Sequence, residues 1–331
     1  MNSFGRIFRV SIFGESHGES VGIVIDGCPA GLSLTEEDLL PDLERRKGGK
    51  QKGTTPRQEA DYPFFKSGFY NGKTTGAPIT IIFENNNVRS EDYNKQRSIP
   101  RPGHADWVAH QKYGGNEDYR GGGHFSARLT TGLVAAGAIA KKLMAGITIE
   151  AAVTEIGGEQ DLEKGLQNAI DAKDSVGGIV ECKVTGLPVG LGEPFFDSVE
   201  SQIAHIAFAI PAVKGIEFGS GFAAAKMFGS QHNDAIENME GKTRTNFAGG
   251  IVGGISNGNE LVFRIAIKPT ASTPKQQNSL NWDTGQTEDF SVKGRHDLCV
   301  ALRAPVILEA ATAVALVDLL LLEQKIKRVI P

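Results

Sequence analysis

The chain has 331 residues, of which 40% are hydrophobic and 22% charged, so a disordered or fibrous protein is excluded and a sizeable core is expected. Its net charge of −4 argues against nucleic acid or an anionic membrane as the main partner. Glycine contributes 41 residues, well above its usual share of about 7%, which predicts many tight turns and close backbone contacts.

Six segments have the composition and spacing of β-strands: residues 6–13, 20–26, 79–84, 147–154, 179–184 and 261–268. The last of them alternates cleanly between polar and apolar side chains. Such alternation is typical of an antiparallel sheet with one covered face. We therefore expect mostly antiparallel pairing.

Two helices are predicted in the first half of the chain. Residues 35–47 begin with acidic and end with basic side chains, which suits the helix dipole, and Pro41 is expected to kink or restart this helix. Residues 126–146 are rich in alanine and glycine. Small side chains let a neighbouring backbone approach, so we expect this second helix to be central.

Two more helices are predicted in the second half. Residues 197–210 start with Asp197 and Glu200, spaced as in a capping box, and Pro211 ends the pattern. Residues 306–328 are apolar almost all round, which predicts burial on several sides by the core or by another subunit.

The organisation of the chain shows no repeat, no low-complexity tract and no break in composition. We therefore expect one α+β domain over residues 1–331 and favour it over two domains. Residues 83–119 have little periodicity and contain several aromatic and histidine residues, so they are predicted to form a long functional loop.

Cellular context is predicted from three features. The three cysteines are odd in number and widely spaced, which argues against a disulfide framework. The first twenty residues lack the apolar segment of a secretory signal. The longest apolar run, residues 306–322, is interrupted by polar residues such as Glu309 and Asp318 and falls short of a bilayer span. We expect a cytoplasmic protein without a membrane partner.

Four histidines lie in glycine-rich or charged contexts: His17, His104, His124 and His296. Histidine titrates near neutral pH, so a histidine in a loop is a ready acid or base, although each one alone could be an ordinary turn or core residue. No pair has the spacing of a zinc motif such as HExxH. No metal is expected.

Residues 45–58 contain six basic and no acidic residues. Their glycines and threonines suit a loop that closes over phosphate or carboxylate groups, and a solvated flexible loop is the alternative. Aromatic residues, which a nucleic-acid site would need, are absent between these positions.

Glycine-rich motifs were compared with known nucleotide-binding patterns. Gly72-Lys73-Thr74 resembles the end of a P-loop, but Ser67 stands where that motif requires glycine. The run at 249–258 precedes a strand, so it predicts a hairpin or a close approach to a planar or phosphorylated ligand. Three glycines before Ser126 predict either a phosphate-binding nest at a helix start or a hinge.

Five motifs together resemble the signatures of the chorismate synthase family over the whole chain, and they lie at 13–18, 101–106, 119–123, 126–128 and 294–297. The resemblance implies elimination of phosphate from 5-enolpyruvylshikimate 3-phosphate to give chorismate, with reduced FMN that is not consumed overall. It also implies an α+β sandwich in which helices lie between mostly antiparallel β-sheets, assembled as a homotetramer.

The resemblance also implies roles for individual residues. His17, supported by Ser16, would protonate the leaving phosphate, and His104 would govern protonation of the flavin. Asp297, tuned by its neighbours Arg295 and His296, would relay a proton from the flavin. The matching substrate-binding residues are Arg46, Lys52, Arg101, Arg128 and Arg295. The matching FMN-binding residues are His124, Phe125, Ser126, Pro211, Ala212, Gly253, Lys268, Pro269, Thr270, Ala271, Ser272 and Arg295.

Three positions depart from the family pattern. His124 and Phe125 replace a common Arg-Ser pair, Lys52 replaces an arginine, and Leu298 replaces a proline. FMN and substrate affinity are therefore left open. The sequence also leaves open whether NADPH reduces the flavin on this protein. A binding protein without catalysis is the alternative class, but it would leave His17, His104 and Asp297 without a role.

Overall fold

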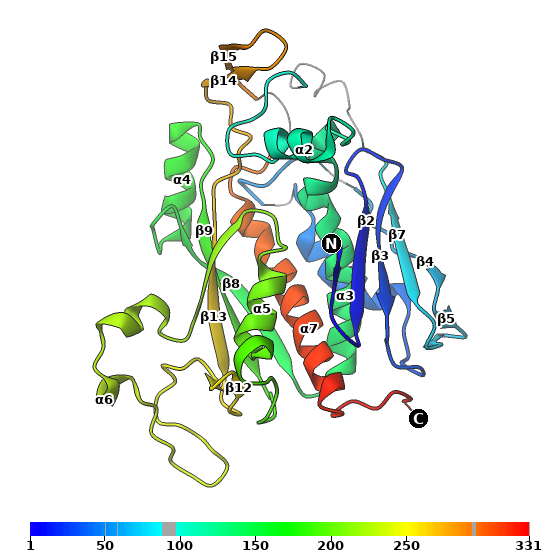
Figure 1. Cartoon of the computed structure of the whole chain (residues 1–331), viewed down its shortest axis with the longest axis vertical. Coiled ribbons are helices and arrows are strands. Elements are labelled where there is room, and N and C mark those ends of the chain that lie inside the picture. The colour runs from blue at the N-terminus through cyan, green and yellow to red at the C-terminus, as the bar shows by residue number, and fades with distance from the viewer. Residues whose placement is uncertain (50, 58, 88–96, 293–295, 331) are drawn as a thin grey trace.

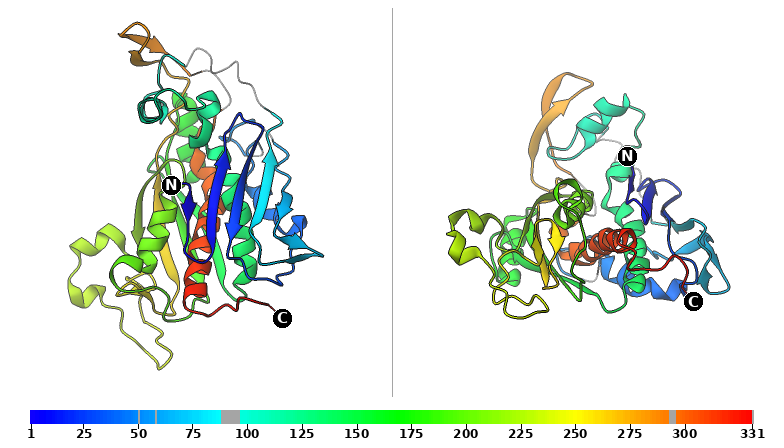
Figure 2. Two further views of the ribbon diagram at one scale, coloured as in Figure 1. Left: turned by 45° about the vertical axis from the view of Figure 1, so that its right-hand side comes forward. Right: turned by 60° about the horizontal axis from the view of Figure 1, so that its bottom comes forward.

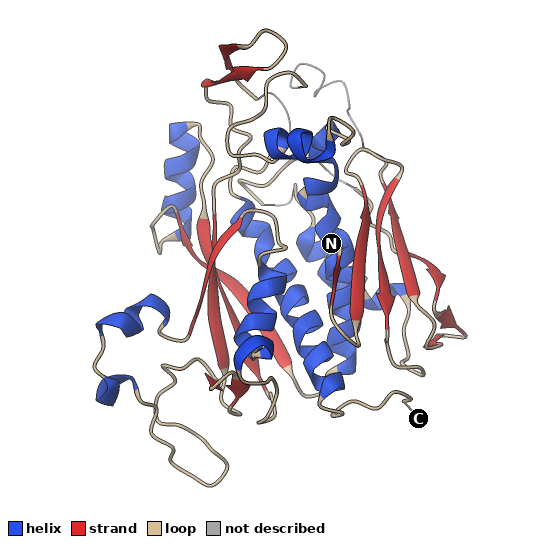
Figure 3. Cartoon of the chain, in the orientation of Figure 1, coloured by secondary structure: helices blue, strands red, loops and turns tan. Residues whose placement is uncertain are grey.

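The computed structural model describes residues 1–330 apart from 50, 58, 88–96 and 293–295. Two antiparallel sheets enclose a layer of helices, as Figure 1 and Figure 3 show. Figure 2 shows the same layering from two further sides. This arrangement confirms the predicted α+β fold class.

The first sheet has the strand order β1-β2-β3-β7-β4. Its strands are β1 (Ser3–Phe4), β2 (Arg9–Gly14), β3 (Ser20–Asp26), β7 (Ile79–Glu84) and β4 (Phe64–Ser67). Strand β3 pairs with β7 from Ser20 opposite Glu84 to Ile25 opposite Ile79. The apolar side chains of β3 are buried against the helices, as the pattern of the sequence predicts.

The second sheet has the order β10-β13-β9-β8. Its strands are β10 (Val213–Phe218), β13 (Leu261–Ile267), β9 (Gly178–Thr185) and β8 (Thr148–Ile156). Strand β13 alternates buried and half-buried residues, as predicted. Three short hairpins complete the strands: β5 (Phe69–Tyr70) with β6 (Lys73–Thr74), β11 (Ile251–Val252) with β12 (Ile255–Ser256), and β14 (Gln277–Asn281) with β15 (Gln286–Phe290).

The α-helices of the described residues are α1 (Leu40–Arg46), α2 (Asp106–Tyr113), α3 (Thr130–Leu143), α4 (Leu162–Ala172), α5 (Val199–Ala207), α6 (Gly229–His232) and α7 (Ala304–Leu322). Short 3₁₀ turns are η1 (Glu36–Asp38), η3 (Arg120–Phe125), η4 (Ala127–Leu129), η5 (Phe195–Asp197), η6 (Gly221–Lys226) and η7 (Val300–Arg303).

Helices α3 and α7 form the centre of the molecule (Figure 1). A Cβ atom placed on Gly137 of α3 would lie 2.3 Å from the Cα and Cβ atoms of Ala310 on α7. Only glycine permits so close an approach. The prediction that the alanine- and glycine-rich helix is central is therefore confirmed.

Helix α7 is long and apolar, yet it carries buried carboxylates. Glu309 binds Arg45 of α1 and Lys141 of α3, and Asp318 accepts the backbone N–H groups of residues 6–8. Within the described residues, Val300–Leu322 is the one helical stretch whose length and composition would allow it to span a membrane, and 89% of its apolar window is buried inside the structure. Here it packs as a core helix.

The boundaries of two predicted helices need correction. The helix predicted at 197–210 begins at Val199, because the Ser198 hydroxyl accepts the Ser201 N–H at 3.0 Å. Asp197 instead pairs with Arg6, so the predicted capping box was wrong. The helix predicted to reach residue 328 ends at Leu322. In contrast, Pro41 restarts the first helix as predicted.

Three α-helices of the described residues were not predicted: the four-residue helix α6, and the longer helices α2 and α4. Helix α2 lies inside the segment that was expected to be a loop, and Ala109 is its one buried residue. Helix α4 begins at a cap in which the Asp161 carboxylate accepts the Lys164 N–H at 3.1 Å. Helices α2 and α4 lie at the end of the molecule where α3 and α7 begin (Figure 1).

Candidate active site

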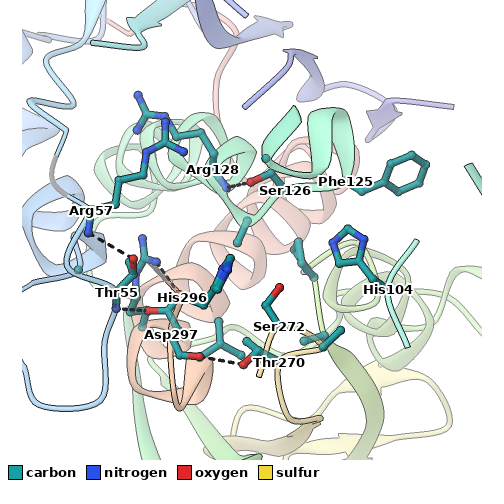
Figure 4. A pocket seen from close by; sticks show the side chains of 18 of the residues that line it. Thr55, Arg57, His104, Phe125, Ser126, Arg128, Thr270, Ser272, His296 and Asp297 are labelled. Atoms are coloured by element: carbon teal, nitrogen blue, oxygen red, sulfur yellow. Dashed lines mark hydrogen bonds and ion pairs between the residues drawn. The ribbon is translucent and has the colours of Figure 1, made fainter. Parts of the chain in front are cut away.

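A cavity of about 440 Å³ lies at the end of the sandwich where α3 and α7 begin. The residues that line it come from distant parts of the chain: 46–48, 55, 57, 59, 61, 101, 103–105, 121, 125–128, 211–212, 268–272, 296–297, 300 and 303. Figure 4 shows Arg57 and Arg128 on one side of this pocket and His104 and Phe125 on the other. The fold thus brings most of the predicted site residues to one place.

The wall of this cavity is strongly basic. Among the described residues its cationic members are Arg46, Lys47, Arg57, Arg101, Arg128, Lys268 and Arg303. Its carboxylates are Glu59, Asp61 and Asp297. Seven basic side chains against three carboxylates leave an excess of four positive charges, in a chain whose net charge is −4. The cavity is therefore built for a polyanion.

Asp61 joins two of the predicted substrate-binding arginines. Its carboxylate pairs with Arg46 at 2.7 Å and also with Arg128, and all three side chains are buried. Burial alone raises the pKa of Asp61, but the two guanidiniums lower it further than burial raises it. Burial lowers the pKa of Arg46 to about 10, so Arg46 stays charged at neutral pH. Arg128 also donates to the side chain of Asn85 at 2.9 Å.

His104 is held by a second ion pair. Arg101 donates from Nε to Asp106 at 2.7 Å, and Nδ1 of His104 lies 2.5 Å from the other oxygen of that carboxylate. Burial raises the pKa of Asp106, but the hydrogen bonds from Arg101 and His104 hold it well below its usual range. Nδ1 of His104 also lies 3.0 Å from Nη2 of Arg101, but its shorter contact is with the carboxylate, which only accepts. Nδ1 therefore donates to Asp106, and Nε2 is left to exchange protons.

His17 and Ser16 lie behind a glycine of the cavity wall. Ser16 is fully buried and His17 is 7% exposed. A Cβ on Gly121, whose φ is +60°, would lie 2.4 Å from Cδ2 and 2.5 Å from Nε2 of the His17 ring. Gly121 lines the cavity, so His17 faces it across this glycine. Gly121, Gly122 and Gly123 all have positive φ and form a non-helical kink within η3, after which Ser126 caps the start of η4.

Asp297 is fixed at both carboxylate oxygens. One oxygen accepts the N–H of Thr55 at 2.8 Å, and the other accepts Nη1 of Arg303 at 3.0 Å. The hydroxyl of Thr270 donates to the carbonyl of Asp297 at 2.8 Å. Among the described residues, Arg303 is thus the cation that pairs with Asp297. Arg295, which was predicted to tune Asp297, lies outside the described residues.

The predicted cofactor residues line two adjoining cavities. Residues Lys268, Pro269, Thr270, Ala271 and Ser272 line the first cavity. A second cavity, of about 400 Å³, shares Phe125, Ser126, Pro211 and Ala212 with the first. The shared surface is largely apolar, and hydroxyl and ammonium donors border it. This donor set fits a flat aromatic ring with a polar edge.

His124 faces a different direction from its neighbours. Its Nδ1 lies 2.8 Å from the carbonyl oxygen of Gly14, and it lines the second cavity rather than the first. A backbone carbonyl only accepts, so Nδ1 donates to it. His124 is therefore placed to contact a ligand that extends beyond the first cavity, either into the second cavity or into the hollow beside β2 that His124 also lines.

Lys52 is not brought to the cavity. Its ammonium donates to Oε1 of Gln167 on α4 at 2.9 Å. The next residue, Gly53, accepts the N–H groups of Leu298 and Cys299 at 2.9 and 3.1 Å, which fixes the loop in this position. The prediction that Lys52 contacts substrate is thus unsupported by its position in this structure.

Gly253 is also remote from the other site residues. It lies in the turn between β11 and β12 with φ +64°, and it is absent from the walls of both cavities. The glycine run at 249–258 forms a hairpin, which was one of the two predicted alternatives. A role for Gly253 in cofactor binding stays a prediction.

Arg57 belongs to the basic segment 45–58 that was predicted to close over an anion, whereas three other important residues were not predicted: Asp61, Asp106 and Arg303. Signals for two of them were available, because Asp106 ends the motif that contains His104, and Arg303 lies six residues after Asp297. Asp61 gave no local signal, since its partners Arg46 and Arg128 are distant in the sequence.

The described residues contain no group of three or more histidine, cysteine or acidic side chains that could hold a metal ion. All three cysteines are buried. Burial raises the pKa of Cys28 and of Cys182 to about 12, so neither is reactive at neutral pH.

Comparisons with known proteins all point to one family. A family model described as chorismate synthase matches residues 8–321. A chorismate synthase from Chitinophaga pinensis is 69% identical over 330 residues, which are 99% of each chain, and one from Dehalococcoides mccartyi is 44% identical over 360 residues, also 99% of each. A solved structure described as chorismate synthase matches with a TM-score of 0.74 at 28% identity, over 96% of this chain and 93% of the other.

Proposed function

The chain belongs to the chorismate synthase family, and from that premise we propose that it converts 5-enolpyruvylshikimate 3-phosphate into chorismate by a trans-1,4-elimination of phosphate that requires reduced FMN. The observation that carries this proposal is the charge of the cavity. Two carboxylates and a phosphate ester carry roughly three and a half to four negative charges near pH 7. The cavity wall has seven basic side chains, and a positive excess remains to receive them after its three carboxylates and the ion-pair partners Glu44 and Asp106 are counted.

Three arginines are suited to grip the substrate. Arg46 and Arg128 are oriented by Asp61, and Arg101 is oriented by Asp106. Because each guanidinium is already held by a carboxylate, little side-chain entropy remains to be lost when an anion binds. Nε of Arg46 is a buried donor without a hydrogen-bond partner among the described residues, and a bound anion would satisfy it.

Two histidines are suited to handle protons. His17 would donate a proton to the departing phosphate, which lowers the cost of the developing negative charge. His104 would hold or release a proton at Nε2, because Nδ1 is committed to Asp106. Asp297 would relay a proton away from the flavin, and the contacts from Thr55 and Arg303 keep its carboxylate oriented.

The adjoining cavities fit FMN. Phe125, Pro211 and Ala212 would contact the flat ring, and Lys268 and Ser272 would bind polar atoms at its edge. When bound, reduced FMN supplies the electron density that starts the departure of phosphate. Whether NADPH regenerates it here is decided by comparing aerobic and anaerobic turnover with NADPH as the sole reductant.

We also propose that the chain works in the cytoplasm as one domain over residues 1–331 and assembles as a homotetramer. A buried core that runs through both sheets supports the single domain. Large apolar side chains are strongly exposed between η5 and the segment after α6, among them Phe195, Phe196, Phe222, Phe228 and Met239. Contacts between copies would cover such a surface. Sedimentation equilibrium tests the tetramer.

An anaerobic assay with chemically reduced FMN tests the reaction. We expect one inorganic phosphate for each chorismate formed and many turnovers for each FMN. If the protein binds substrate but releases no phosphate with reduced FMN present, it is a binding protein and the proposed function is wrong.

A further inference from the structure

Arg57 is a cation of the cavity wall to which the family resemblance assigns no role. Its guanidinium points two nitrogens at Ser16: Nη1 donates to the hydroxyl at 3.2 Å, and Nη2 donates to the backbone carbonyl at 3.3 Å. The side chain is largely buried, at 18% exposure. The Arg57 guanidinium therefore contacts both the side chain and the backbone of Ser16, the residue immediately before His17.

Glu59 fixes the orientation of this guanidinium. Its Oε1 accepts Nε of Arg57 at 3.1 Å and Nη2 at 2.7 Å. The same carboxylate accepts the backbone N–H of Asn86 at 3.1 Å and of Asn87 at 3.2 Å. A buried carboxylate with several donors is a rigid anchor, so it keeps the planar fork of Arg57 directed at Ser16.

The opposite side of the Ser16-His17 pair is closed by the glycine turn. Ser16 donates its N–H to the carbonyl of Gly123 at 3.1 Å. A Cβ on Gly121 would lie 3.1 Å from the Ser16 hydroxyl and within 2.5 Å of the His17 ring. The pair is thus confined between Arg57 and the turn at 121–123, and within the part of the chain that the structure describes Arg57 is the side chain that donates to the Ser16 hydroxyl.

We propose that Arg57, anchored by Glu59, is a positioning residue that fixes Ser16 and thereby holds His17 in line to protonate the leaving phosphate. The inference rests on the proposed function of His17 and extends it to Arg57, in the basic segment 45–58, and to Glu59, which lies just after that segment. Proton transfer requires a donor at hydrogen-bond distance, and a displacement of about 1 Å can cost on the order of 100-fold in rate.

Arg57→Lys is the decisive variant, since lysine keeps the charge but cannot contact both atoms of Ser16 and Glu59 at once. We expect kcat to fall by about 10- to 100-fold, while KM stays within about threefold. Glu59→Gln should have the same kind of effect but a smaller one. The matched control is Arg264→Lys, because Arg264 also bridges a carboxylate, Glu217, and a backbone carbonyl, that of Gly219, on the second sheet. It should leave kcat unchanged.

A double-mutant cycle separates positioning from direct substrate binding. In a His17→Ala background, Arg57→Lys should lower phosphate release by less than about threefold, because the residue that it positions is gone. An undiminished loss in that background, or a rise in KM in place of a fall in kcat, would show that Arg57 grips substrate itself and would overturn the proposal. Normal turnover of His17→Ala alone would instead refute the assigned role of His17. Thermal unfolding of each variant confirms that it is folded.

Discussion

The two sides of the cavity differ in polarity and in how their charged side chains are paired. On one side lies the paired wall, in which every guanidinium forms an ion pair with a carboxylate. It consists of Arg46, Arg57, Glu59, Asp61 and Arg128. On the other side lies the open wall, which is apolar with a few hydrogen-bond donors at its border. It consists of Phe125, Pro211, Ala212, Lys268 and Ser272.

The difference between these walls follows from what each is proposed to bind. Buried cations repel one another unless anions separate them, so a site for a polyanion has to carry its own counter-ions. A flat ring needs mainly apolar surface, which requires no such network. The paired wall should therefore respond sharply to single substitutions in both stability and turnover, whereas the open wall should respond weakly and only in cofactor affinity.

The largest effect is expected at two histidines: His17, which follows the Ser16 that Arg57 contacts, and His104, which lies on the side of Phe125. His17→Ala and His104→Ala should each lower turnover by about 10- to 10⁴-fold, the range for loss of a general acid or base. Both variants should keep the unfolding temperature of the parent. Near-normal turnover in both would remove them from the mechanism and would leave the paired wall with a binding role alone.

The next largest effect is expected for Asp61→Asn, which leaves two buried guanidiniums without their shared counter-ion. Breaking a buried ion pair in this way costs about 3–5 kcal/mol. Urea unfolding monitored by circular dichroism measures the loss. Asp26→Asn is the control, because its pair with Arg9 is exposed and should contribute at most about 1 kcal/mol. Equal losses in the two variants would show that the paired wall is not specially organised.

A smaller effect is expected on the open wall. Phe125 is 40% exposed in the structure, so Phe125→Ala should leave the free energy of unfolding almost unchanged. An aromatic stacking contact contributes about 0.5–1.5 kcal/mol to a binding free energy, so its loss should weaken FMN binding by roughly 2- to 10-fold. Titration of oxidised FMN, followed by its fluorescence, measures this. An unchanged affinity would mean that the ring does not lie against Phe125.

The smallest effect is a pH dependence of stability at Asp106. Its pKa is lowered in the folded state, so its ion pair stabilises the protein above the unfolded pKa of about 3.9, and that contribution is lost as the pH falls toward the folded pKa. Replacing Asp106 by Asn should therefore shrink the loss of unfolding free energy between pH 6 and about pH 3.5. If the variant and the parent lose the same amount, Asp106 does not stabilise the fold by this linkage.

Parts of the fold with a strong local pattern could be predicted from the sequence. Strands β3 and β7 have the predicted bounds because their buried residues form clear apolar patterns. Helix α2 could not be found in this way, since it buries only Ala109 and so has almost no apolar face. Helix α4 could have been found, because Asp161 caps it and its buried residues recur at helical spacing.

The residues of the candidate site also differ in whether they could be predicted from the sequence. The motifs around His17, His104 and Asp297 are contiguous in the sequence and could be recognised. The anchors of the paired wall could not, because Asp61 joins Arg46 to Arg128 and these contacts exist only after folding. Lys52 matches the family motif by its position in the sequence. In the structure, however, hydrogen bonds to the adjacent Gly53 fix the loop so that Lys52 contacts Gln167 of α4.

The central claim is that the paired wall binds the substrate and the open wall binds the flavin. A crystal structure of the protein with oxidised FMN and 5-enolpyruvylshikimate 3-phosphate tests it most directly. The account predicts that the substrate's phosphate and carboxylates contact Arg46, Arg101 and Arg128, and that the flavin ring lies against Phe125 and Ala212. A structure in which the flavin contacts the paired wall, or the substrate lies in the second cavity away from these arginines, would contradict it.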